Sequence, residues 1–109
     1  MKQIKVIIKK YMVSKVIKDI RDFVNSPDVV VSSVVVFGKP KEMKSNIKIF
    51  HEYFSYSKRV KLEFVISDEH LDSVIDIIKN SIYTRNPDDG EIFVSSVDEI
   101  LKFQNGERK

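Results

Sequence analysis

The hydrophobic pattern of this 109-residue chain occurs twice in tandem, and the repeat limits the folds that are open to it. Apolar residues first alternate with polar ones, then recur at every third or fourth position, and then form a run of valines. Alternation is typical of a half-buried strand, whereas a spacing of three and four is typical of an amphipathic helix. A second strand, helix and strand follow. We expect strands over residues 2–9, 29–37, 60–66 and 92–94, and helices over residues 13–24 and 71–82.

Two strand–helix–strand units predict an α+β fold, a ferredoxin-like βαββαβ sandwich with both helices on one face of an antiparallel sheet. The nearly continuous valines of residues 29–37 indicate a strand buried on both faces at the centre of that sheet. The face without helices is then expected to be apolar. A large exposed apolar patch favours association between copies.

The connection between the second and third strands, residues 37–59, is about four times longer than an ordinary hairpin loop. It carries six positive and two negative residues, a net charge of +4 against +3 for the whole chain. A long, basic and aromatic loop is typical of a contact surface. The alternative is that residues 47–54 extend the hairpin and pack on the body. The expected partner-binding residues are Lys41, Lys44, Lys48, Phe50, His51, Tyr53 and Phe54.

Composition excludes several other classes of protein. The chain has no cysteine, which excludes disulfides and thiolate metal sites, and the two histidines His51 and His70 lie in different elements. We expect no metal site. No apolar stretch approaches the roughly 20 residues of a membrane span, and the N-terminus lacks the apolar run of a signal peptide. The expectation is one cytoplasmic domain over residues 1–109.

Several short motifs resemble the PII signal transduction proteins of nitrogen regulation. They are Ile-Lys-Val-Ile-Ile-Lys at residues 4–9, Val-Phe-Gly at 36–38, Arg-Val-Lys-Leu-Glu at 59–63 and, most specifically, Asp-Gly-Glu-Ile-Phe-Val at 89–94. Residues 38–58 stand in the place of that family's T-loop. The resemblance implies a trimer with an adenine nucleotide, ATP or ADP, in each cleft between subunits and 2-oxoglutarate beside magnesium-ATP. It also implies a T-loop that contacts a protein target, such as an ammonium transporter or an enzyme of nitrogen metabolism.

The resemblance also assigns residues to the nucleotide site. Asp88 replaces a glycine of the family's phosphate turn, and three further positions depart from the family's pattern. Pro40 replaces a glutamine, and Glu91 and Gln104 replace a lysine and an arginine that bind phosphate. ATP or ADP binding is therefore expected to be weak, and 2-oxoglutarate binding is in doubt. The candidate nucleotide-binding residues are Gly38, Lys39, Arg59, Val65, Asp88, Asp89, Gly90 and Lys102.

Other functions remain as alternatives. The same three departures are compatible with a PII-like trimer that has lost nucleotide sensing and acts as an adaptor or senses another small molecule. Nucleic acid binding is not expected, because the third strand offers only Phe64 where an RNA-recognition sheet needs several aromatic side chains. An enzyme is not expected either, since the sequence pattern contains no nucleophile–base pair.

Overall fold

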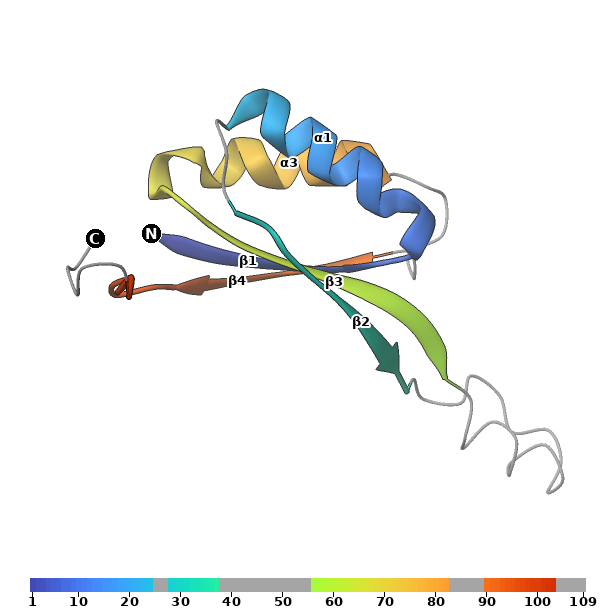
Figure 1. The fold of residues 1–109 in the computed structure, drawn as a ribbon. Coiled ribbons are helices and arrows are strands. Elements are labelled where there is room, and N and C mark those ends of the chain that lie inside the picture. Colours follow the sequence, from blue (N-terminus) through green and yellow to red (C-terminus); the bar gives the residue numbers. More distant parts are fainter. Residues whose placement is uncertain (25–27, 38–55, 83–89, 104–109) are drawn as a thin grey trace, which may run out of the picture.

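The computed structural model describes residues 1–24, 28–37, 56–82 and 90–103. Two helices cover one face of a four-stranded antiparallel sheet whose strand order is β2-β3-β1-β4 (Figure 1). The predicted ferredoxin-like fold is confirmed. The elements are β1 (Lys2–Ile8), the 3-10 turn η1 (Lys10–Met12), α1 (Val13–Phe23), β2 (Val30–Val36), β3 (Ser57–Ile66), the 3-10 turn η2 (Asp68–His70), α3 (Leu71–Ile82) and β4 (Gly90–Ser96).

The core lies between the two helices and the two central strands. Alternate residues of β1 and β3 point toward the helices and are buried, as the period of two in the sequence predicts. The helices contribute Val16 and Ile20 from α1 and Val74 and Ile78 from α3 to the core, and all four are fully buried. Each such side chain contributes roughly 1.5–3 kcal/mol when it is removed from water. The strand residues of the core are Ile4, Val6, Ile8, Val60, Leu62, Phe64 and Ile66.

The expectation that the valine-rich strand lies at the centre of the sheet is wrong. It forms β2, which pairs only with β3 and is an edge strand. The two crossover helices bring β1 and β3 together in the middle, and this leaves β2 and β4 at the edges. A run of valines therefore indicated a strand correctly but not its neighbours. Val30, Val31 and Val35 are 60%, 51% and 49% exposed.

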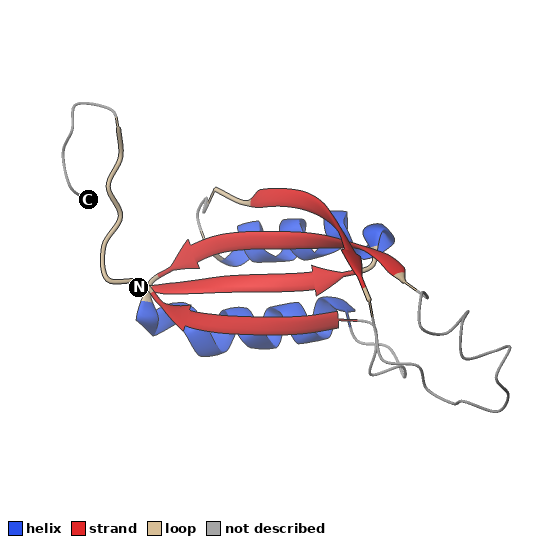
Figure 2. Ribbon diagram, turned by 90° about the horizontal axis from the view of Figure 1, so that it is seen from below, coloured by secondary structure: helices blue, strands red, loops and turns tan. Residues whose placement is uncertain are grey.

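The expectation that the helix-free face is apolar along the central strands is wrong for most of its positions. Figure 2 looks onto this face, and the register gives it Gln3 and Lys5 from β1 and Lys61 and Glu63 from β3. Lys61 Nζ lies 3.2 Å from Glu63 Oε1, and Gln3 Nε2 donates to Glu63 Oε2 over 3.4 Å. The polar residues of these strands alternate with the buried ones, and Ile7 and Val65 are the apolar residues that β1 and β3 bring to this face. A polar ladder thus runs across the middle of this face.

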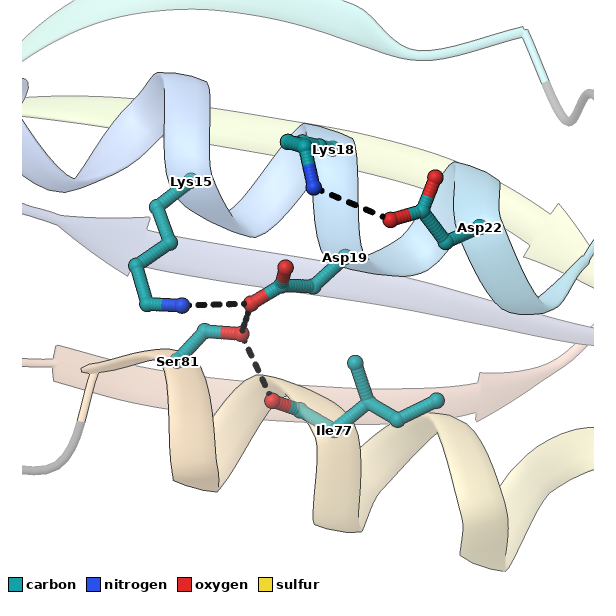
Figure 3. Close-up of polar contacts among 6 residues, drawn as sticks. All are labelled: Lys15, Lys18, Asp19, Asp22, Ile77 and Ser81. Carbon is teal, nitrogen blue, oxygen red and sulfur yellow. Dashed lines mark hydrogen bonds and ion pairs between the residues drawn. The ribbon is translucent and has the colours of Figure 1, made fainter.

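One hydrogen bond joins the two helices directly (Figure 3). Ser81 Oγ lies 2.6 Å from Asp19 Oδ2 and 2.8 Å from the carbonyl oxygen of Ile77. A hydroxyl has a single proton to donate, and the charged acceptor makes the stronger bond. Lys15 Nζ approaches the same carboxylate at 3.0 Å. The hydrogen bond from Ser81, followed by that from Lys15, lowers the pKa of Asp19 from its ordinary value of 3.8.

The bond between the helices makes stability depend on pH in a defined direction. A lowered pKa means that the folded state favours the carboxylate, so the contribution is present at neutral pH and is lost as the pH falls through the folded pKa. We expect Ser81→Ala to lower the urea midpoint of unfolding at pH 7. The difference from the wild type should shrink below about pH 4, near the ordinary pKa of an aspartate.

Ser73→Ala is the matched control, because Ser73 is exposed on the same helix and the substitution changes helix propensity in the same way. Urea unfolding of the three proteins from pH 3 to pH 7, followed by circular dichroism, measures the effect. If Ser81→Ala lowers the urea midpoint more than Ser73→Ala does, and by the same margin at pH 3 and pH 7, the role of the Asp19 carboxylate is contradicted.

Candidate ligand site

The structure describes four of the eight candidate nucleotide residues: Arg59, Val65, Gly90 and Lys102. The other four, Gly38, Lys39, Asp88 and Asp89, lie outside the described residues. So do all seven candidate partner-binding residues, Lys41, Lys44, Lys48, Phe50, His51, Tyr53 and Phe54. Of the segment 38–58, the structure assigns Ser57 and Lys58 to β3, which begins three residues before the expected start.

Arg59 and Gly90 lie toward one end of the sheet. Arg59 stands opposite Val34 of β2 on the helix-free face, and its Nη1 donates to the carbonyl oxygen of Lys58 over 3.0 Å. Gly90 stands opposite Ile8 at the end of β1. The rings of Phe37 and Tyr56, which flank the segment 38–55, lie 5.8 Å apart between their centroids. This end of the sheet presents the guanidinium as its cationic group on the helix-free face.

Gly90 has a structural role beside any role in binding. A Cβ atom at this position would lie 2.8 Å from Ile82 Cδ1 and 3.1 Å from Ile8 Cγ2. A side chain at the start of β4 would therefore fit only if the end of the Ile82 side chain moved aside. Glycine in the motif Asp-Gly-Glu-Ile-Phe-Val thus also favours close packing of β4 against α3, whatever the turn before it binds.

Val65 and Lys102 lie at the opposite end of the sheet. They line an open recess of about 410 Å³ whose walls come from the end of β3, the starts of β1 and β2 and the segment after β4. Asp28 and Glu63 bring negative charge to it, and Ile100 brings apolar surface. Sequence reasoning assigned Val65 and Lys102 to one site, but it missed these neighbours, because only the strand order brings them together. The recess is lined by Gln3, Asp28, Val30, Glu63, Phe64, Val65, Ile100 and Lys102.

The two groups are far apart within one chain. Arg59 and Val65 stand on the same face of β3, six residues from each other, which corresponds to about 20 Å along a strand. One end offers a guanidinium and the other an ammonium group, and either can bind an anion. A single chain therefore does not gather the four described candidate residues around one small ligand.

Comparison with known proteins decides the family. The family model described as nitrogen regulatory protein P-II matches residues 1–107. The chain belongs to the P-II family. The nitrogen regulatory protein P-II of Rhizobium meliloti (strain 1021) is 32% identical over 107 residues, which cover 98% of this chain and 95% of that protein. The nitrogen regulatory protein GlnK of Escherichia coli (strain K12) is 30% identical over 110 residues, with the same coverage.

A solved structure supports the P-II fold independently. The crystal structure of Arabidopsis thaliana PII bound to citrate superposes with a TM-score of 0.77 and covers 99% of this chain and 87% of that one, at 24% identity. The family and both relatives carry the name of nitrogen regulatory proteins, which makes this chain a member of a regulatory family. In the described part of this P-II chain, no three His, Cys, Asp or Glu residues are grouped as metal ligands. No helix among the described residues is long and apolar enough to cross a membrane.

The close approach at Gly90 can be tested by substitution. Gly90→Ala places a methyl group against Ile82 Cδ1, and we expect the free energy of unfolding to fall by about 1–3 kcal/mol, the usual cost of overpacking. Ile82→Val removes that Cδ1 atom, so Gly90→Ala should cost less in the Ile82→Val background. Urea denaturation of the wild type, both single variants and the double variant measures this coupling. An equal cost of Gly90→Ala in both backgrounds would refute it.

Proposed function

We propose that this P-II protein is a regulatory signalling protein that binds an adenine nucleotide, ATP or ADP, between copies of itself and controls a partner protein. The observation that carries the proposal is the separation of Arg59 and Gly90 from Val65 and Lys102, in a chain that matches the P-II family over residues 1–107. Residues that the family resemblance assigns to one ligand lie about 20 Å apart within a single chain. A second copy is the simplest way to bring them together.

The proposed assembly is a homotrimer of single-domain chains, residues 1–109, as the family resemblance implies. The Arg59 and Gly90 end of one sheet meets the Val65 and Lys102 end of the next. Such a head-to-tail contact uses two different surfaces, and it closes into a ring when the rotation between copies fits. The helix-free faces, each with the ladder of Gln3, Lys61 and Glu63, then turn toward the threefold axis.

The charge of the cleft limits its affinity for phosphate. Arg59 and Lys102 supply the described cations, with Lys39 expected beside them. Against these stand Glu91, exposed on β4 next to Gly90, and Asp28 of the recess. The charge of Glu63 in the recess is partly offset by Lys61, whose Nζ lies 3.2 Å from Glu63 Oε1. Opposite charges a few ångströms apart interact by about 4 kcal/mol at an effective dielectric of 20, and like charges repel by as much. We therefore expect weak binding of ATP or ADP, with 2-oxoglutarate in doubt.

The segment 38–58 is the proposed contact with the partner. Its candidate residues are Lys41, Lys44, Lys48, Phe50, His51, Tyr53 and Phe54, and the resemblance suggests an ammonium transporter or an enzyme of nitrogen metabolism as target. The protein would work in the cytoplasm, without catalysis, nucleic acid binding or membrane insertion. The alternative, favoured by the carboxylate of Glu91 beside Gly90, is a trimer that has lost ATP and 2-oxoglutarate sensing and acts as an adaptor or senses another small molecule.

Calorimetric titration of the purified protein with ATP, ADP, AMP and 2-oxoglutarate tests the ligand. We expect a dissociation constant below about 1 mM for at least one adenine nucleotide, equivalent to a binding free energy beyond about −4 kcal/mol. Light scattering should give about three times the chain mass of 12.7 kDa. A trimer that binds none of the four would support the adaptor alternative, and a monomer would refute the cleft.

A mixing experiment tests whether one site takes residues from two copies. Arg59→Glu and Lys102→Glu should each weaken nucleotide binding, because each replaces a cation by an anion. When the two variants are unfolded and refolded together, mixed trimers contain at least one cleft with both native cations, and binding should partly return. Separate refolding of each variant is the control. If the mixture binds nucleotide as weakly as each variant alone, while the refolded wild type binds it, the site lies within one chain.

A further inference from the structure

The edge strand β2 lacks the usual protection of an exposed edge. Its sequence over Val30–Val36 is five valines and two serines, without charge or proline. Natural edge strands usually carry lysine, proline or a bulge, because unpaired backbone groups accept strands from other chains. In the part of the chain that the structure describes, β2 has β3 as its neighbour on one side and no strand on the other. Such an edge is ready to pair with another extended segment.

A groove runs along this edge on the helix side of the sheet. Its volume is about 670 Å³, and it lies between β2, the start of β3 and the beginning of α1. The register places Val31, Ser33 and Val35 of β2 on this side, with Val35 opposite Lys58. In Figure 1, β2 and β3 twist away from the two helices toward the end of β2. The valines that face the groove are consequently about half exposed.

The groove has one sign of charge. Lys10 at the start of η1 and Lys58 at the start of β3 line it, together with Ser14 in the first turn of α1. Arg59 also borders it, although the register places this residue on the helix-free face. No carboxylate is among its described lining residues, and the first turn of α1 contains no acidic residue. The positive end of the helix dipole adds to the same field. An occupant with negative charges and small apolar side chains is complementary to this surface.

We propose that β2 and this groove bind an extended acidic segment of a partner protein, which adds as a strand to the edge of the sheet. Backbone hydrogen bonds to β2 would hold the segment, and alternate side chains would point into the groove. Valine or a residue of similar size suits the positions over Val31 and Val35, while glutamate or aspartate suits those near Lys10 and Lys58. This surface is separate from the segment 38–55 and adds a second contact to the proposed function.

A second copy of this chain is the main competing occupant. Its edge strand β4, Gly90–Ser96, contains a single acidic residue, Glu91, and so offers little charge to a groove lined by Lys10 and Lys58. The groove therefore favours a partner richer in carboxylates than the chain's own free edge. The experiment below separates the two occupants.

The test uses the full chain and three fluorescein-labelled nine-residue peptides. The first alternates valine with glutamate, the second alternates valine with lysine, and the third is the first with N-methyl groups on alternate backbone nitrogens along the edge that would face β2. Fluorescence anisotropy measures binding at low salt. We expect saturable binding of the glutamate peptide, at least about tenfold weaker binding of the lysine peptide, and a similar loss for the N-methylated peptide.

Charge-reversed variants locate the binding surface. Lys10→Glu and Lys58→Glu should each lower the affinity for the glutamate peptide by about tenfold, because an attraction at the edge of the groove becomes a repulsion. The difference in affinity between the glutamate and lysine peptides should become smaller in both variants. Lys79→Glu, on the exposed side of α3, is the matched control and should leave the affinity unchanged. Arg59 is left intact, so that failure here is distinguishable from failure of the proposed nucleotide site.

Three results would overturn the proposal. One is no saturable binding of the glutamate peptide by a correctly folded protein. Another is equal binding by the wild type, Lys10→Glu and Lys58→Glu. The third is hydrogen exchange that shows the amides of β2 protected in the peptide-free oligomer and exposed on dilution to the monomer, which would assign the edge to a second copy.

Discussion

The alternation of apolar side chains along β1 and β3 is the constraint on which the rest of the structure depends. The buried side chains of the two strands share one face, and a β-strand exposes successive residues on opposite faces. A shift of one residue in either strand would turn its whole set toward water. Each helix packs a narrow apolar stripe against this face, Val16 and Ile20 on α1 and Val74 and Ile78 on α3. Strand register, helix rotation and core composition are therefore fixed together.

The same constraint explains what is left uncovered. α1 has 11 residues and α3 has 12, which makes each helix about 17 Å long, whereas the ten residues of β3 span about 33 Å. Two helices of this length cannot cover the full hairpin of β2 and β3. The uncovered part is where Val31, Val35, Lys58 and Arg59 line a groove. Its exposure follows from the mismatch in length and not from loose packing.

The sequence predicted the elements well because their signals are local. Strands and helices fall within a few residues of the expected positions, and β3 deviates most at its start, at Ser57 instead of residue 60. The order of the strands in the sheet and the contacts between the helices could not be predicted in this way. The valines of β2 carry a strong strand signal whether the strand is central or at an edge, and the bond between Ser81 and Asp19 depends on which helix faces meet.

The candidate site shows the same division between local and nonlocal information. The resemblance to the family identified Arg59, Val65, Gly90 and Lys102 from the sequence alone. That Val65 and Lys102 share a recess with Asp28 and Glu63, far from Arg59, followed only from the strand order. The sequence revealed Glu91 beside Gly90, whereas only the structure placed the carboxylates of Asp28 and Glu63 beside Val65 and Lys102.

Division of a site between copies has a thermodynamic consequence for a signalling protein. A ligand that contacts two subunits binds the assembled form and not the separate chain, so it stabilises assembly by an amount that grows with its concentration. Conversely, a partner that favours one arrangement of the subunits must change the affinity for the ligand by the same factor. In the proposed trimer, β2 ends at Val36 and β3 begins at Ser57, both close to Arg59 in the hairpin. Ligand at that end of the sheet would then be coupled to the partner-binding segment through the shortest available route, the end of the hairpin itself.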